Sequence, residues 1–185
     1  LRLSRGLGDV YKRQIPFCYE VFEAASKQRT KAKKIEVLKT YAHDSIMAVL
    51  IWNFDESVVS LLPEGDVPYG NTREDNSVTG SLSDKINDAV GMMRESGSTS
   101  LGSQDQGKAS IRKEYSKFYN FLKGGNNGLT NLRRETMFIN ILEGLHPLEA
   151  EILVLVKDKK LTDRYKITKE VVSAAYPQIV WGGRS

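Results

Sequence analysis

Residues 119–161 read YNFLKGGNNGLTNLRRETMFINILEGLHPLEAEILVLVKDKKL, and this stretch decides the fold class. Apolar residues recur at helical spacing on both sides of the segment 124–128 (GGNNG). Glycine and asparagine accept the left-handed backbone that ends a helix, so one helix ends here and the next begins at Thr130 or Asn131. Pro147 marks another boundary, because proline favours the first position of a helix. The stretch therefore predicts amphipathic helices joined by tight corners.

Apolar periodicity continues on both sides of this stretch. It predicts further helices over residues 17–27, 31–42, 82–93, 110–123 and 169–176. The segment 45–54 (SIMAVLIWNF) is apolar on nearly all sides, so we expect it at the centre of the core, as a helix or a partly buried strand. The predicted fold class is therefore all-α, with about six to eight short helices and a long irregular middle segment.

The middle of the chain lacks this periodicity. Prolines and glycines in 62–77 (LPEGDVPYGNTREDNS) predict a surface loop, and Ser, Gly and Gln dominate 95–107, which predicts a disordered insert. We therefore expect one domain in four parts. These are a tail at 1–14, an N-terminal helical part at 15–62, a loop and insert with one short helix at 63–109, and a C-terminal helical part at 110–182.

The composition excludes several functional classes. The 185 residues are 40% hydrophobic and 27% charged, enough for one modest core, and no stretch approaches the roughly 18 apolar residues of a membrane helix. One cysteine, Cys18, cannot form an internal disulfide or a Cys-rich zinc site, and His43 and His146 are too far apart for the common His-rich metal motifs. We therefore expect no metal, no cofactor, no membrane partner and no catalytic activity.

Residues 1–14 (LRLSRGLGDVYKRQ) resemble a translated remnant of a sequencing adapter, which would make them foreign to the folded domain. The alternative is a genuine flexible basic arm. The segment has four basic residues and one acidic residue, so it supplies +3 of the formal net charge of +4 and leaves +1 for the remainder. A chain that is basic overall, as a protein that coats nucleic acid would be, is therefore not implied.

Cations and aromatic residues alternate in the predicted helix at 110–123. Three lysines are interleaved with four rings: Lys113, Lys117 and Lys123 with Tyr115, Phe118, Tyr119 and Phe121. Such a mixture suits single-stranded nucleic acid, whose bases stack on rings while its phosphates pair with cations. The alternative, which the helical spacing favours, is that the rings face the core and the lysines face water.

The glycine-rich turn after this helix is a second candidate site. Backbone amides at Gly124 and Gly125 would precede a helix start, where they could cradle a phosphate beside Arg133 and Arg134. The Walker spacing is absent, so the favoured alternative is a helix–turn–helix corner that needs left-handed residues. The outline of helix, short turn and helix also matches that of DNA-reading motifs, although it is common in other proteins.

Two further basic runs accompany the helices. Residues 27–39 carry a local charge of +5 and residues 157–169 a local charge of +4. Runs of this kind usually mark solvated helix faces. If the fold placed both runs on one side with Arg133 and Arg134, they would form a basic patch on an otherwise nearly neutral protein.

Three blocks of the chain carry a resemblance to a known family: FEAASKQRTKAKKIEVL at 22–38, LPEG followed by VPY within 62–69, and the stretch 119–161. In their order these blocks are similar to a family of short uncharacterised proteins encoded by T4-like marine phages, including cyanophages. The resemblance implies a viral source and expression in the cytoplasm of an infected bacterium. It transfers no catalytic residue.

The favoured hypothesis is a non-catalytic phage accessory protein that acts by binding, with nucleic acid or another phage or host protein as its partner. Tentative nucleic-acid or anion ligands are Lys113, Lys117, Lys123, Gly124, Gly125, Arg133 and Arg134. The alternative is a structural or assembly component of the virion, in which the same helices pack against a partner protein. A third hypothesis is an interaction module that redirects a host enzyme.

Overall fold

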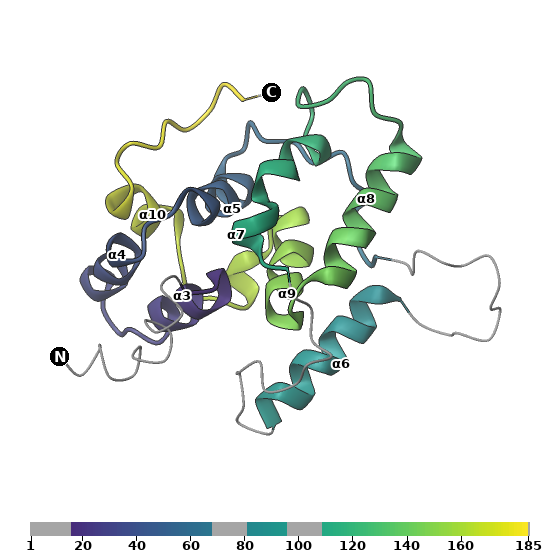
Figure 1. Cartoon of the computed structure of the whole chain (residues 1–185). Helices are drawn as coiled ribbons and strands as arrows, with labels where there is room; N and C mark the ends of the chain where they lie inside the picture. The colour runs from purple at the N-terminus through teal and green to yellow at the C-terminus, as the bar shows by residue number, and fades with distance from the viewer. Residues whose placement is uncertain (1–15, 68–80, 96–108, 185) are drawn as a thin grey trace.

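The computed structural model describes residues 16–67, 81–95 and 109–184, and within them the fold is all-α, as predicted (Figure 1). These residues form helices and two isolated bridges, Ser60 with Leu122 and Ala109 with Leu145, without a β-strand. The predicted tail at 1–14, most of the predicted loop at 62–77 and nearly all of the predicted disordered insert at 95–107 lie outside the described residues. The α-helices are α3 (Cys18–Ser26), α4 (Lys31–Thr40), α5 (Asp44–Phe54), α6 (Leu82–Glu95), α7 (Ile111–Glu114), α8 (Asn131–Gly144), α9 (Pro147–Lys157) and α10 (Lys169–Ala175), and the 3₁₀ helices are η1 (Tyr115–Phe121) and η2 (Leu161–Asp163).

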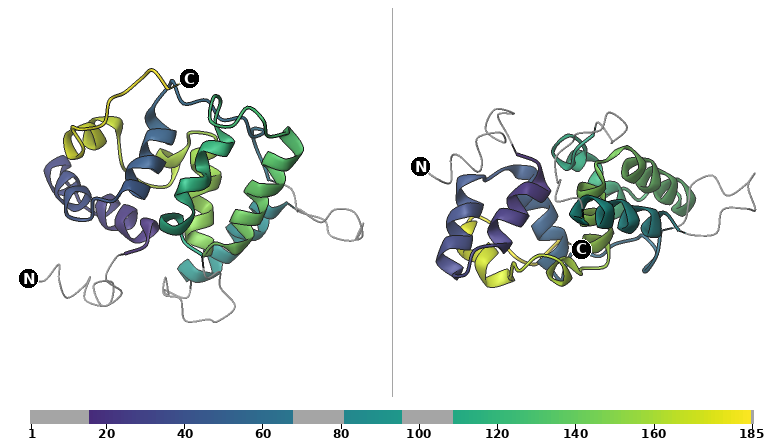
Figure 2. Two further views of the ribbon diagram at one scale, coloured as in Figure 1. Left: turned by 45° about the horizontal axis from the view of Figure 1, so that its top comes forward. Right: turned by 90° about the horizontal axis from the view of Figure 1, so that it is seen from below.

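Helix α9 lies at the centre of the fold. It packs against α3, α5, α6 and α8, which surround it in Figures 1 and 2. Its apolar residues Leu148, Ile152, Leu153 and Val156 are fully buried, as expected of a helix that is apolar on most sides. The helix begins as its sequence dictates: Pro147 occupies the first turn, and the ring of His146 accepts a hydrogen bond from the amide of the second helical residue. None of the described helices is long and apolar enough to cross a bilayer.

The end of the chain packs against its first helices. Helix α4 lies between α3 and α10, and the hydroxyl of Tyr176 donates a hydrogen bond of 2.6 Å to the carbonyl of Leu38. Thr168 caps α10, because its side chain accepts a hydrogen bond from the amide of Val171. The predicted central segment 45–54 forms α5, whose Leu50 and Trp52 are buried. His43 caps α5, because its ring accepts a hydrogen bond from the Ser45 amide, and Asp44 is the first helical residue.

The predicted helix at 110–123 is wrong in its second half. Only Ile111–Glu114 is α-helical, and Tyr115–Phe121 continues as the 3₁₀ helix η1. A 3₁₀ helix has three residues per turn, so Tyr115, Phe118 and Phe121 fall on one edge. Phe118 and Phe121 pack against Trp52 of α5, with ring centroids 5.7 and 6.3 Å away. The segment adopts the 3₁₀ period because this period places Phe118 and Phe121 in the aromatic cluster. Tyr119, which the α-helical period places on the core face, is therefore 53% exposed.

A buried carboxylate joins the starts of two helices. Glu149 of α9 has no solvent exposure, and its two oxygens accept hydrogen bonds from the amides of Tyr19 (2.9 Å) and Ile111 (3.4 Å). The amide of Cys18 also donates to this carboxylate. Helix starts leave amides without partners inside the helix, and here one residue of α9 supplies acceptors for both α3 and α7. Burial raises the pKa of Glu149 to about 7, although these three hydrogen bonds oppose the shift.

The lysines that follow α9 hold loops in place. The Lys157 ammonium is buried and donates to the carbonyls of Pro63 (2.8 Å) and Gly65 (3.0 Å), while Asp158 accepts from the Gly65 amide. The Lys159 ammonium donates to the carbonyls of Trp52 and Asp55 at the end of α5, at 2.8 and 2.7 Å. Lys157 is therefore a buried structural cation, whereas the side chain of Lys159 holds the end of α5 from an exposed position.

Candidate nucleic-acid interface

The seven predicted site residues surround η1 and the start of α8, but they do not form one site. Lys117 and Arg133 face a groove between η1 and α8, whereas Lys123, Gly124 and Gly125 line a cavity between η1 and α5. Lys113 is exposed on α7 and lines neither. The 3₁₀ helix thus forms a ridge that separates the two groups.

Arg134 is buried, so its predicted role as an anion ligand is wrong. Its exposure is 4%. Its guanidinium donates to the carbonyls of Asn120 (2.8 Å), Leu129 (3.1 Å) and Asn126 (3.3 Å) and to the side-chain oxygen of Asn131 (2.7 Å). These acceptors belong to the end of η1, to the turn before α8 and to the first residue of that helix. The guanidinium therefore shapes the corner from inside, and its donors face the protein instead of a ligand.

The glycine turn is explained by its own backbone. Gly124 has a φ of +85°, in the left-handed region that side chains disfavour. A Cβ at Gly125 would lie 1.9 Å from the carbonyl oxygen of Tyr119, so the turn passes too close to η1 for any side chain. The amide of Gly125 donates to the carbonyl of Leu122, and that of Lys123 to Val59. With these amides engaged, the corner interpretation accounts for the turn better than a phosphate cradle.

The η1–α8 groove is mainly apolar. It measures about 860 Å³ and is lined, among others, by Glu114, Lys117, Leu132, Arg133, Met137 and Ile141. Leu132 is 71% exposed at its edge. Lys117 pairs with Glu114 at 2.8 Å, so Arg133 is the cation of this lining whose charge is not offset by an ion pair among the described residues. The groove suits an apolar partner surface better than a phosphate chain.

The aromatic cavity, defined here by Trp52, Tyr115, Phe118, Tyr119, Lys123 and Arg184, lies on the other side of η1. It measures about 390 Å³. Rings from α5 and η1 form its wall, and two cations from the glycine turn and the C-terminal tail complete the lining. The cavity thus combines the rings and cations that the sequence places together, but with a contribution from the tail.

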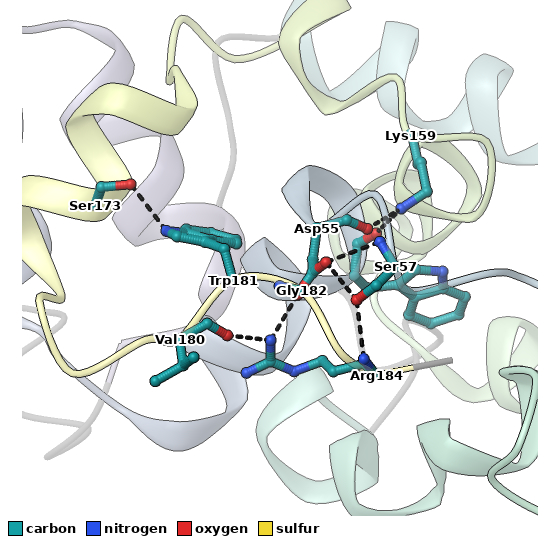
Figure 3. A network of polar contacts seen from close by, with 9 residues as sticks. Asp55, Ser57, Lys159, Ser173, Val180, Trp181, Gly182 and Arg184 are labelled. Carbon is teal, nitrogen blue, oxygen red and sulfur yellow. Dashed lines mark hydrogen bonds and ion pairs between the residues drawn. The ribbon is translucent and has the colours of Figure 1, made fainter.

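Asp55 fastens that tail (Figure 3). Its carboxylate accepts hydrogen bonds from the amides of Ser57 (2.9 Å) and Gly182 (3.0 Å), the hydroxyl of Ser57 (2.7 Å) and the guanidinium of Arg184 (2.6 Å). Burial alone would raise the pKa of Asp55, but these hydrogen bonds outweigh it and hold the pKa well below its usual range. Trp181 also holds the tail, because its indole N–H donates a hydrogen bond of 3.0 Å to the hydroxyl of Ser173.

Removing this carboxylate should release the tail. In Asp55→Ala, the donors from Gly182 and Arg184 lose their acceptor, and we expect a loss of about 2–3 kcal/mol in the free energy of unfolding. Hydrogen exchange at the Gly182 amide should accelerate, because only this contact protects it. Asp163→Ala, an exposed carboxylate in η2, is the matched control. Equal exchange rates at Gly182 in the two variants would contradict the assignment.

A second group of cations lies at α4 and α10, away from η1 and α8. Helices α4 and α10 pack together, and the Lys34 ammonium donates to the carbonyl of Lys166 at 2.6 Å. Partial burial and the nearby Lys166 charge lower the pKa of Lys34. Lys31 pairs with Glu170 at 2.7 Å, with both side chains largely exposed. We use the term basic face for the cations of segments 27–39 and 166–170, which meet where α4 packs against α10: Lys27, Arg29, Lys31, Lys33, Lys34, Lys39, Lys166 and Lys169, the last of which lies over the ring of Trp181.

This face concentrates the charge of the protein. Its eight cations are accompanied by two acidic residues of the same segments, Glu36 and Glu170, which leaves +6. The whole chain carries +4, so all other residues together carry −2. The fold brings the run 27–39 together with the end of the run 157–169, where α4 packs against α10. Helix α8, which carries Arg133, lies across α9 from these helices (Figure 2). The sequence signal for the face was the +5 run itself.

Comparison with known proteins gives one family. Residues 21–90 and 97–163 match a family of unknown function (DUF6433) and together cover well over half of the chain. No curated protein and no solved structure matches the chain. The match includes all of α4, α5, α8 and α9, and therefore most of the basic face and both sides of η1.

Proposed function

The chain belongs to this family of unknown function, and on that premise we propose that it is a non-catalytic nucleic-acid-binding protein of a tailed phage, active inside the infected bacterium. One observation carries the proposal: the segments of the basic face have a net charge of +6, which exceeds the net charge of +4 of the entire chain. The similarity of blocks 22–38 and 119–161 to T4-like phage proteins supports the viral source.

The chemistry of the face suits a phosphate backbone. A duplex carries one negative charge per roughly 1.7 Å of its axis, and each neutralised phosphate releases condensed counterions. Lys27, Arg29 and Lys33 are exposed and make no ion pair with another described residue. The flexible lysines recognise charge more than shape. We therefore expect binding with weak sequence preference and strong salt dependence.

The test neutralises the basic face and compares salt slopes. In Lys27→Gln/Arg29→Gln/Lys33→Gln, affinity for a fluorescent duplex should fall at low salt. The slope of log K against log salt should become less negative by about 2–3, since each lost phosphate contact removes roughly 0.9. Fluorescence anisotropy between low and physiological salt measures both quantities.

The matched control removes the same charge from the other side. Lys113→Gln/Lys117→Gln/Arg133→Gln should leave the slope within experimental error of the unaltered protein. If this variant lost affinity for the duplex while the basic-face variant kept it, the interface would lie at η1 and α8. Absence of any binding to single- or double-stranded nucleic acid at low salt would remove the proposal altogether.

The η1–α8 groove favours a second candidate function, a virion structural or assembly role. Leu132 stands 71% exposed beside this apolar lining, and exposed apolar surface of this kind marks contact sites for proteins. A virion component should be detected by mass spectrometry in purified particles of the source phage. Its absence from those particles would exclude this role and leave nucleic-acid binding as the candidate.

A further inference from the structure

We propose that the aromatic cavity binds one nucleoside monophosphate unit, with the base against the rings and the phosphate at Lys123 and Arg184. This inference rests on the proposed function and deepens it. The aromatic cavity would contact bases, while the basic face would bind phosphates. The unit has two possible sources, a free nucleotide or one residue of a single strand, and the same chemistry recognises both.

The wall of the cavity is built to stack a planar ring. Tyr119 is 53% exposed, although it belongs to an otherwise buried aromatic segment. It is turned outward because the 3₁₀ period places Phe118 and Phe121 in the core. Tyr115 and Phe118 line the cavity beside it. Base–aromatic stacking tolerates every base, because each has a π-face.

Two cations lie at the cavity from different elements. The Lys123 side chain is exposed, and its ammonium has no partner among the described residues. Arg184 uses Nη1 for Asp55 and for the carbonyl of Val180, while Nε and Nη2 form no hydrogen bond or ion pair with the described part of the chain. Asp55 thereby orients the guanidinium in advance, which lowers the entropy cost of holding an anion.

A buried donor in the same lining has no acceptor. The indole N–H of Trp52 is buried and unpartnered among the described residues. Buried polar groups almost always have partners, so such an exception calls for an explanation. The nitrogen has almost no accessible surface, so an acceptor of a bound base reaches it only when the ligand displaces the side chains around it. The volume of about 390 Å³ fits one small ligand and lies within the usual range for such sites.

Calorimetric titration with adenosine 5′-monophosphate tests the site. We expect saturable binding of the nucleotide, weaker binding of adenosine and none of inorganic phosphate alone. Tyr119→Ala should weaken nucleotide binding by roughly five- to one-hundred-fold, the range for removing one stacking ring. Leu132→Ala, which also truncates an exposed apolar side chain but in the η1–α8 groove, is the control and should bind like the unaltered protein.

Oligonucleotides distinguish the two sources of the unit. If a strand supplies it, Tyr119→Ala should weaken binding of a single-stranded oligonucleotide while duplex affinity stays unchanged. If the ligand is a free nucleotide, the single strand should bind both proteins equally. The proposal would be overturned if the nucleotide did not bind at millimolar concentration, or if Tyr119→Ala and Leu132→Ala lost affinity for it equally.

The two proposals fail independently. The basic-face variant Lys27→Gln/Arg29→Gln/Lys33→Gln should keep its full affinity for the mononucleotide. If no duplex binds but the mononucleotide does, the proposed function fails and the cavity assignment stands. If duplex binds with a steep salt slope and the mononucleotide does not, the cavity assignment alone is wrong.

Discussion

Glu149→Ala should lower the free energy of unfolding by at least about 3 kcal/mol, since each buried amide left without an acceptor costs roughly 1–3 kcal/mol. Three amides are affected, those of Cys18, Tyr19 and Ile111. They start α3 and α7, two helices that are distant in sequence and share this one acceptor. Urea denaturation followed by circular dichroism measures the change, and the unfolding of both helices should remain a single transition.

Glu149→Gln separates the hydrogen bonds from the charge. The amide keeps the side-chain length and one carbonyl acceptor, so we expect a smaller loss than in Glu149→Ala. It also removes the cost of holding a carboxylate in a site without solvent exposure. If Glu149→Ala were as stable as Glu149→Gln, the carboxylate would not be the shared cap that its contacts indicate.

The difference in the free energy of unfolding between the unaltered protein and Glu149→Gln should depend on pH. Because burial raises the pKa of Glu149 from near 4.5 to about 7, the folded state binds a proton more tightly than the unfolded state. Its contribution is therefore fully present at low pH and decreases as pH rises between these two values. The stability of the unaltered protein relative to Glu149→Gln should fall by an amount on the order of 3 kcal/mol across that window. A relative stability that rises with pH there would contradict the shift.

Periodicity and capping residues were enough to predict most helices. The α8 start illustrates this: the Thr130 side chain accepts a hydrogen bond from the Arg133 amide, as a threonine before an apolar repeat predicts. Helix α9 followed from Pro147 and the apolar run after it. These signals are local, so a single sequence contains them in full.

The tightening of η1 could not be predicted in this way. An α-helical period of 3.6 assigns Tyr119 to the core face, whereas a period of three assigns Phe121 to it. Both rings are aromatic, and the choice between the two periods depends on Trp52, more than 60 positions earlier in the chain. The aromatic cavity was therefore missed, although the mixture of rings and lysines that builds it was noticed.

Part of the candidate site was predicted wrongly from the charges along the chain, because contacts between distant residues decide which cations are exposed. Cations are buried only where partners satisfy them, and the partners of the buried Arg134 and Lys157 are mainly backbone carbonyls. Every residue has a carbonyl, so no residue type in the sequence announces such a contact. The basic face was easier to foresee, because six of its eight cations come from one short run with one acidic residue.

Arg134→Ala should be the second strongly destabilising change, because four oxygens of the corner before α8 lose their donor at once. Removing a buried group that is hydrogen-bonded in this way typically costs about 3 kcal/mol or more. We expect faster hydrogen exchange in the turn before α8 and at the first amides of that helix, measured by mass spectrometry on peptides from 124–140. Arg134→Lys should recover part of the loss, since an ammonium has three donors but lacks the planar fork.

The neighbouring Arg133 supplies the control, which tests whether the loss of stability is specific to the buried arginine. Arg133 is exposed in the η1–α8 groove, so Arg133→Ala should change stability by no more than about 0.5 kcal/mol. Two adjacent arginines on one turn of helix would then differ because one faces the corner's carbonyls and the other faces solvent. Equal stability of the two variants, together with a loss of nucleic-acid affinity in Arg134→Ala alone, would instead mean that this guanidinium leaves the corner to meet a phosphate.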